Sequence, residues 1–115
     1  MANAMLNVEV TITHDRFPEI IAKLPNLAHD MVAKAASDVE ARSKQICPVR
    51  TGALKNSINT EFLEPALASV GPNMDYSIYV EFGTYKMAAQ PYMRPAADMV
   101  RPQFIEACER VLKTL

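Results

Sequence analysis

The chain has few of the residues on which cofactor and metal motifs depend. It contains only three glycines, and no glycine-rich phosphate-binding loop is present. Its two cysteines, Cys47 and Cys108, lie far apart and have no cysteine or histidine close by, whereas a structural zinc site normally takes four such ligands. We therefore expect no metal and no cofactor. Two buried, reduced thiols of a cytosolic product are the favoured interpretation, and a disulfide is the alternative.

Long apolar runs and a strong net charge are missing as well. No stretch approaches the ~20 residues of a membrane-spanning helix, and the first residues lack the regions of a signal peptide, so no membrane partner is expected. Met5 offers an alternative start, and residues 1–4 are expected to be disordered or foreign to the native chain. The net charge is -1 and the pI is about 6.1, which disfavours free DNA or RNA as the main partner.

The remaining composition is that of an ordinary globular protein, with 50% hydrophobic and 22% charged residues. A chain of 115 residues is expected to bury roughly two thirds of its unfolded surface, which is enough for one core. We predict a single domain over residues 1–115.

Hydrophobic periodicity predicts the first half of the fold. Residues 6–13 alternate strictly between apolar and polar side chains, which indicates a half-buried strand. Asp15 can cap a short helix that has Pro18 in its first turn. The strongest helix signal covers residues 26–46, where one narrow stripe of mostly small residues recurs at three- and four-residue steps: Ala28, Val32, Ala35, Ala36, Val39, Ser43 and Ile46. A core-facing stripe is the favoured interpretation, and a partner-binding helix is the alternative.

The region after Pro48 is expected to be a loop, in which Thr51 can cap a short helical turn over residues 53–57. Residues 58–63 and 66–70 are predicted to be two short strands. For residues 75–83 we favour a short helix, although their composition also suits a strand.

Residues 84–93 are expected to form a long loop, and the last segment is a helix that Pro102 either kinks or restarts. The element order predicts an α+β fold: a small antiparallel sheet packed against two long helices, with a long protruding loop.

Charge is distributed in two opposed blocks. Residues 41–60 carry only basic charges, at Arg42, Lys44, Arg50 and Lys55. Residues 61–81 carry only acidic charges, at Glu61, Glu64, Asp75 and Glu81. Such a pattern favours head-to-tail association between copies, which closes into a ring when the rotation allows it. Neutralisation within one subunit is the equally weighted alternative.

The loop at 83–94 has an unusual composition. We expect it to expose Tyr85, Met87, Tyr92 and Met93, and these residue types are enriched in the cores of interfaces. Ordered loops of this length are usually functional. The alternative is a loop that folds back over its own core.

Nothing in the sequence indicates catalysis. His14 is expected to be a polar turn residue and His29 a solvated helix residue, and neither has an obvious nucleophile nearby. The motifs GxSxG and HExxH do not occur. We predict that the protein is not an enzyme.

Three blocks of sequence carry a family resemblance. They are residues 48–58 (PVRTGALKNSI), 76–84 (YSIYVEFGT) and 86–95 (KMAAQPYMRP). In this order and spacing they resemble the hallmark blocks of the gene-product-10-like tail-component family of HK-type lambdoid phages and prophages, over about residues 20–115. We call them the first, second and third block.

The resemblance implies a structural virion protein of the neck or tail that lacks catalytic residues. It implies a ring, expected to be a hexamer, that contacts neighbouring head-completion or tail-tube proteins while DNA passes through without sequence-specific binding. The base-free stretch 56–85 is our candidate for the lumen surface. The residues carried over to a subunit or partner interface, together with those from the charge and loop patterns, are Arg50, Thr51, Gly52, Leu54, Lys55, Tyr79, Glu81, Phe82, Gly83, Thr84, Tyr85, Met87, Gln90, Pro91, Tyr92, Met93 and Arg94. The alternative function is a small non-enzymatic bacterial adaptor that binds a single protein partner.

Overall fold

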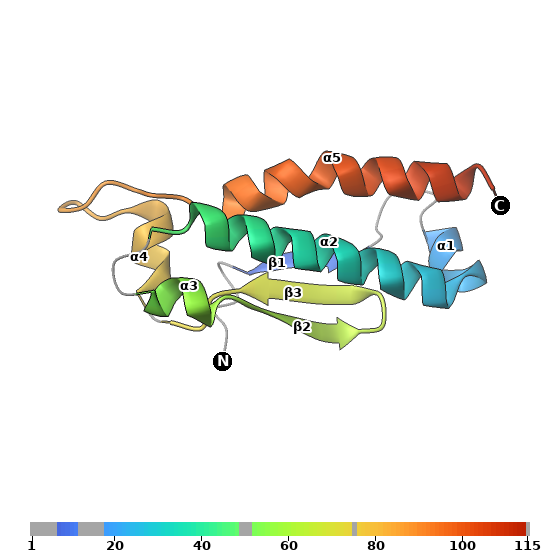
Figure 1. Ribbon diagram of the computed structural model, residues 1–115, viewed down its shortest axis with the longest axis horizontal. Coiled ribbons are helices and arrows are strands. Elements are labelled where there is room, and N and C mark those ends of the chain that lie inside the picture. The colour runs from blue at the N-terminus through green and yellow to red at the C-terminus, as the bar shows by residue number, and fades with distance from the viewer. Residues whose placement is uncertain (1–6, 12–17, 49–51, 75, 115) are drawn as a thin grey trace.

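The computed structural model describes residues 7–11, 18–48, 52–74 and 76–114 (Figure 1). In chain order the elements are β1 (Val8–Thr11), α1 (Pro18–Lys23), α2 (Pro25–Ile46), α3 (Ala53–Ser57), β2 (Asn59–Glu64), β3 (Leu67–Gly71), α4 (Ser77–Phe82) and α5 (Met93–Leu112). The predicted α+β fold, with two long helices and a small antiparallel sheet, is confirmed. Several predicted positions lie outside the described residues: Leu6, Ile12, His14, Asp15, Arg50, Thr51, Asp75 and Leu115.

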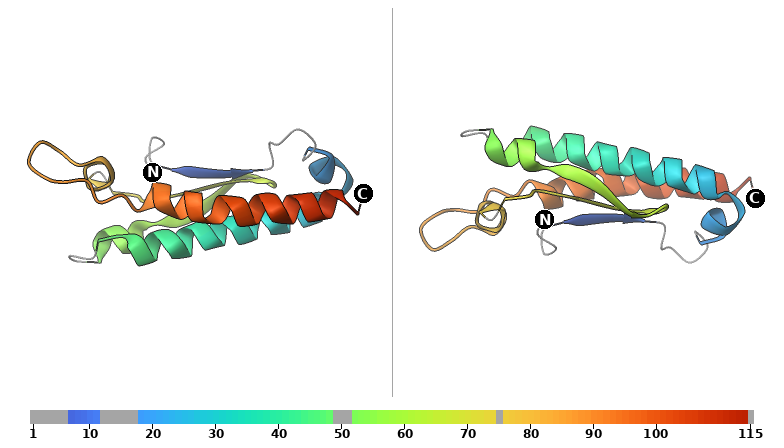
Figure 2. Two further views of the ribbon diagram at one scale, coloured as in Figure 1. Left: turned by 90° about the horizontal axis from the view of Figure 1, so that it is seen from above. Right: turned by 90° about the horizontal axis from the view of Figure 1, so that it is seen from below.

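The molecule is elongated, with principal extents of 52 × 24 × 20 Å. Its radius of gyration is 15.3 Å, against about 13 Å for a compact domain of this length. The helices α2 and α5 run side by side along the long axis, and the sheet lies beneath them (Figures 1 and 2). One end carries α3, α4 and a projecting loop, and the other carries α1 and the C-terminus. The long axis therefore separates two very different ends.

The sheet has the order β1-β3-β2, and both pairings are antiparallel. Val70 of the central strand is paired with Val8 on one side and Thr60 on the other, so these three residues share one face. Ala68 and Val70 on that face are fully buried. On β2, by contrast, only Thr60 is partly buried, and its other five residues are exposed. β2 is therefore an exposed edge strand.

Helix α2 holds the core together, as the stripe of small residues predicted. Ala28, Val32, Ala36 and Val39 are at most 1% exposed. Small side chains allow the α2 backbone to approach both the sheet and α5 closely. The favoured core interpretation of the stripe is confirmed.

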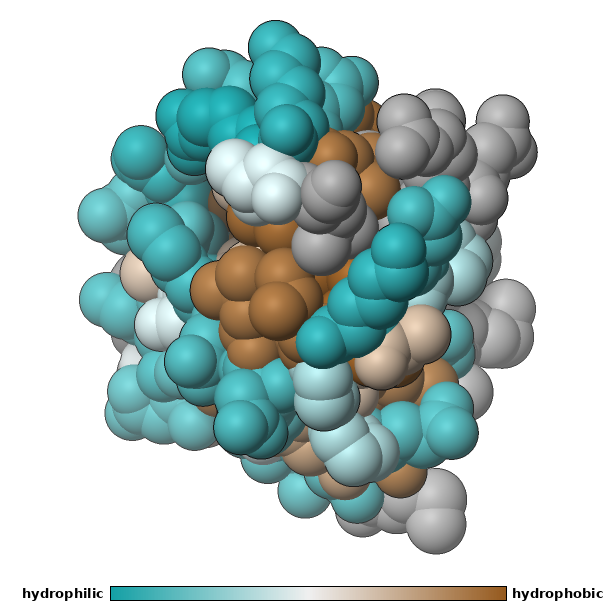
Figure 3. Space-filling view, turned by 90° about the vertical axis from the view of Figure 1, so that its right-hand side faces the viewer, coloured by the Kyte–Doolittle hydropathy of each residue, from teal (hydrophilic) through white to brown (hydrophobic). Residues whose placement is uncertain are grey.

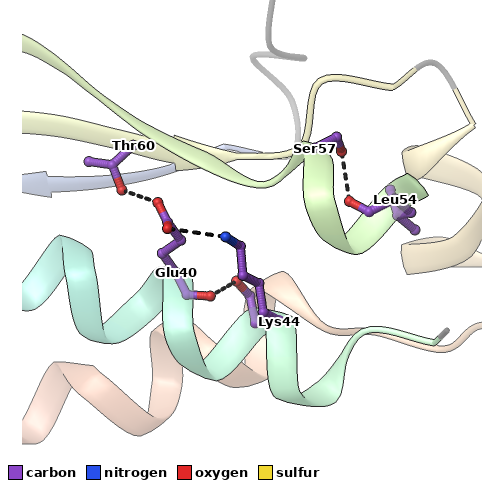
Figure 4. Close-up of polar contacts among 6 residues, drawn as sticks. Glu40, Lys44, Leu54, Ser57 and Thr60 are labelled. Atoms are coloured by element: carbon purple, nitrogen blue, oxygen red, sulfur yellow. Dashed lines mark hydrogen bonds and ion pairs between the residues drawn. The ribbon is translucent and has the colours of Figure 1, made fainter. Parts of the chain in front are cut away.

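A polar link fixes α2 to the edge strand. The Thr60 hydroxyl donates a hydrogen bond of 2.8 Å to Glu40 of α2, whose carboxylate also pairs with Lys44 at 3.3 Å (Figure 4). This contact sets the position of β2 relative to the helix layer.

Helix α5 begins at Met93 and runs through Pro102 as a single helix. Its buried residues are Met93, Ala96, Val100 and Cys108, which lie at three-, four- and eight-residue steps along one side of the helix. Cys108 and Cys47 are free and buried, as the favoured interpretation predicted, and they form no disulfide with each other. Burial raises the pKa of Cys108 to about 11.

The expectation that His29 is a solvated helix residue holds only in part, because the residue is half-buried. Its ring lies 4.7 Å from that of Phe62 on β2, and its Nδ1 donates a hydrogen bond to the carbonyl oxygen of Pro65. Because His29 is more than thirty residues away from Phe62 and Pro65 in the sequence, local sequence patterns could not predict this contact. His29 holds the end of the β2–β3 hairpin against α2.

The end that carries α1 has an apolar centre with a polar rim (Figure 3). Half-buried apolar side chains from α1, α5 and the residue that links α1 to α2 pack against the core in this part of the molecule: Ile21, Leu24, Val111 and Leu112. Ile20 of α1 is fully buried, so this short helix closes one end of the core.

Candidate functional site

The three sequence blocks meet at the end of the molecule that carries α3 and α4 (Figure 1). Between them lies an open pocket of about 420 Å³, which we call the motif pocket. All three blocks contribute to its lining: Pro48, Gly52 and Leu54 from the first, Tyr76, Tyr79 and Val80 from the second, and Met87 and Gln90 from the third. Residues as far apart in sequence as Pro48 and Gln90 thus form one surface.

The projecting loop, residues 83–92, is an ordered arm. Thr84 and Met87 exchange two backbone hydrogen bonds, of 2.8 and 3.2 Å, and the Gln90 N–H donates to the carbonyl of Val80 at 2.8 Å. Gly83 has φ +78°, and a Cβ there would lie 2.7 Å from the backbone nitrogen of Ala89. The arm therefore requires glycine at this position.

The tip of the arm is fully presented to solvent. Tyr85 is 94% exposed, and the Lys86 ammonium lies 5.5 Å from the centre of its ring. Figure 2 shows the arm reaching beyond both long helices. The expected exposure of Tyr85 is confirmed, and Met87, at 37%, is also exposed.

The expected exposure of Tyr92 and Met93 is wrong. Tyr92 is 0% and Met93 1% exposed, and both belong to the core. Burial, followed by the neighbouring Cys47 thiol and the Glu81 carboxylate, raises the pKa of Tyr92 well above its usual value. The alternative interpretation, a loop folded over its own core, is correct for this half of the segment.

Tyr92 and Met93 are held against the core by Glu81, which is itself only 4% exposed. Its carboxylate accepts hydrogen bonds from the backbone N–H groups of Tyr92 and Met93 at 3.0 Å each, and of Arg94 at 3.3 Å. The first N–H groups of a helix lack partners within the helix, and a carboxylate satisfies them. Glu81 thus anchors the start of α5 and cannot present its charge to another molecule.

Five large apolar residues remain exposed at this end, and we call them the tip patch: Tyr76, Tyr79, Phe82, Tyr85 and Met87. Their exposed fractions range from 37% to 94%. Monomeric proteins rarely gather so many exposed aromatic side chains, and such patches usually mark a binding surface. Tyr76 was missing from the predicted interface, although it is the first residue of the second block.

The other predicted interface residues differ in how far they are exposed to solvent. Leu54 is buried, and Gly52 occupies the N-cap position of α3 at φ +81°. Residues that the structure leaves accessible at this end are Lys55, Thr84, Gln90, Pro91 and Arg94.

The two charge blocks do not pair with each other among the described residues. Lys44 pairs with Glu40 at 3.3 Å, and Arg42 donates to Gln45 at 3.3 Å, both within α2. Glu61 and Glu64 lie exposed on β2. Neutralisation within the subunit is therefore not seen in the described part of the chain.

In residues 7–11, 18–48, 52–74 and 76–114, no group of three or more histidine, cysteine or acidic residues is placed to hold a metal ion. None of the helices formed by these residues is long and apolar enough to span a bilayer.

A family model described as "Bacteriophage HK97-gp10, putative tail-component" matches residues 15–83, which is more than half of the chain. The chain belongs to this family. The match to the tail-component family includes the first block and nearly all of the second, and it ends at Gly83 where the arm begins. No curated protein and no solved structure is significantly similar to the chain.

Proposed function

We propose that this tail-component protein is a structural part of a tailed phage or prophage virion. It forms or joins a ring, of hexameric type, at the head–tail connector or the tail terminus. Its partners are further copies of itself and neighbouring head-completion or tail-tube proteins. This proposal rests on the family to which the chain belongs.

The tip patch is the main structural support for the proposal. Five exposed apolar residues and an open pocket of about 420 Å³ lie at the projecting end of an elongated molecule. A small domain has a limited core, and association would bury this apolar surface. An arm held by hydrogen bonds and by Gly83 loses little freedom on binding, which favours affinity.

The sheet supplies a surface suited to a DNA conduit. Glu9, Ser69 and Glu61 are register partners across the three strands, so they share one face. Thr60 contacts Glu40 of α2, so its neighbour Glu61 points away from the helices. The stretch 56–85 contains no lysine or arginine. Such a lumen would not bind the phosphate backbone and would let DNA pass.

Deletion of the gene from the phage or prophage that encodes the protein tests the proposal. A head–tail connector role predicts separate filled heads and tails in electron micrographs, whereas a tail-terminus role predicts tails of abnormal length. Wild-type protein supplied from a plasmid should restore normal particles. Normal, infectious virions in the absence of the gene would contradict the proposal.

A further inference from the structure

The end of the β2–β3 hairpin carries an exposed apolar side chain in a fixed position. The register places Phe62 opposite Ala68 and Glu64 opposite Leu67, so Leu63 between them has no partner on β3. A bulge of this kind turns a side chain out of the regular pleat. Leu63 is 52% exposed, the most exposed apolar residue of the described sheet.

The hairpin end is held rigidly behind Leu63. His29 contacts the ring of Phe62 at 4.7 Å and donates a hydrogen bond to the carbonyl of Pro65. Contacts on both sides of Leu63 thus fix the backbone that carries it. We call residues 61–64 the knob. A preorganised knob loses little conformational entropy when it enters a pocket.

The charges around the knob are opposite to those around the motif pocket. Glu61 and Glu64, both exposed, flank the apolar pair Phe62 and Leu63. The elements that form the motif pocket carry Lys55 on α3 and Lys86 on the arm, while the acidic group of α4, Glu81, is buried and bonded to α5. An apolar knob flanked by acidic residues therefore complements an apolar pocket whose neighbouring elements, α3 and the arm, carry basic residues.

The knob and the motif pocket of one molecule cannot meet. The β2–β3 turn lies at one end of the sheet, and α3 and α4 lie at the other (Figure 1). A strand rises by about 3.3 Å per residue, so β2 keeps the two surfaces well apart. Contact between them requires two molecules, and it joins different surfaces of the two. Such a heterologous contact builds rings when its rotation closes.

We infer that the motif pocket of each subunit receives the knob of a second copy of this chain, with Leu63 inserted beside Tyr79 and Glu64 facing Lys55 and Lys86. This inference rests on the proposed ring-forming function and specifies which surfaces meet.

Disulfide trapping with the variant L63C/Y79C tests the contact. The two positions lie too far apart to bridge within one molecule, because a disulfide needs Cα atoms about 4.4–6.8 Å apart. The native thiols, Cys47 and Cys108, are buried and react slowly. The matched control is L63C/M99C, since Met99 on α5 is 53% exposed and Tyr79 56%. We expect covalent oligomers of L63C/Y79C to form about tenfold faster than those of the control.

Charge reversal gives an independent readout on the same trap. Adding K55E and K86E to L63C/Y79C should slow trapping severalfold, and adding E64K as well should restore it in part. Equal trapping rates for L63C/Y79C and L63C/M99C, or indifference to charge reversal, would overturn the inference.

The two proposals fail in different experiments. If trapping proceeds at the control rate but gene deletion still disrupts the virion, the knob-and-pocket contact is wrong and the structural role stands. If virions form normally without the gene, the structural role itself is wrong. Circular dichroism of each variant confirms that the trapped species are folded.

Discussion

The buried carboxylate of Glu81 accepts a hydrogen bond of 3.0 Å from the backbone N–H of Met93, the first residue of α5. This contact joins α4 to the long C-terminal helix and closes the base of the arm. The arm can therefore project from the molecule while both of its ends remain fixed to the core.

Removing the charge of Glu81 should destabilise the fold. The variant E81Q keeps the shape of the side chain but weakens three hydrogen bonds to a buried carboxylate. We expect the free energy of unfolding to fall by about 1–3 kcal/mol in urea denaturation. The control E61Q changes an exposed carboxylate and should stay within about 0.5 kcal/mol of wild type. Equal stabilities of the two variants would refute the anchoring role.

Truncation to alanine should affect the stability of the fold very differently at two tyrosines of the arm, Tyr92 and Tyr85. Tyr92 is fully buried, so Y92A should cost about 3–5 kcal/mol of monomer stability. Tyr85 is 94% exposed, so Y85A should leave the unfolding free energy within about 0.5 kcal/mol of wild type. Thermal and chemical denaturation measure both. A stable Y92A variant would show that the residue is not part of the core.

Two glycines with similar φ angles, +81° at Gly52 and +78° at Gly83, but different ψ angles, should differ in their tolerance of alanine. At Gly83 a Cβ would lie 2.7 Å from the Ala89 nitrogen and 2.9 Å from the Met87 carbonyl oxygen. At Gly52 the nearest atom is the Asn56 amide nitrogen at 3.8 Å. G52A should cost about 1–2 kcal/mol for positive φ alone, and G83A should cost more because the arm must also shift. Equal costs in urea denaturation would contradict the packing seen at Gly83.

The stability should fall in alkaline solution, in part through Cys108. Its folded pKa of about 11 lies above that of an unfolded thiol, so the neutral thiol stabilises the fold below about pH 8.5. This contribution is lost progressively as the pH rises toward the folded pKa. Urea denaturation between pH 7 and pH 10.5 should show a steeper decline for wild type than for C108A. Parallel curves would mean that Cys108 does not contribute to the pH dependence.

Local patterns in the sequence were sufficient for most of the fold. The stripe from Ala28 to Ser43 predicted the buried face of α2, because small residues at helical spacing suit close packing. The strands predicted at 58–63 and 66–70 each lie one residue later, at 59–64 and 67–71, and the short helix favoured within 75–83 covers 77–82.

The errors concern contacts between distant residues. Tyr92 and Met93 were predicted to be interface residues because their residue types are enriched at interfaces. The nearby sequence gave no indication that Glu81, eleven residues before Tyr92, accepts a hydrogen bond from the Tyr92 backbone. His29 likewise gave no sign of its contact with Phe62. A buried carboxylate that satisfies a helix terminus depends on tertiary geometry, which periodicity and composition do not encode.

The candidate site was partly accessible from sequence. The structure brings the three blocks together around the motif pocket, as expected if they form one surface. The fold was needed to tell core residues from surface residues within those blocks. Tyr79 and Glu81 are only two residues apart in α4, yet Tyr79 is 56% exposed and Glu81 only 4%.

The most direct test of the account asks whether the tip patch is needed to build a virion. A phage that lacks the gene is supplied with either Y79S/F82S or M99S, which alter residues of similar exposure, from 53% to 57%. We predict that M99S restores infectious particles, whereas Y79S/F82S accumulates as a folded protein and fails to restore them. Full restoration of infectious particles by Y79S/F82S would contradict the account.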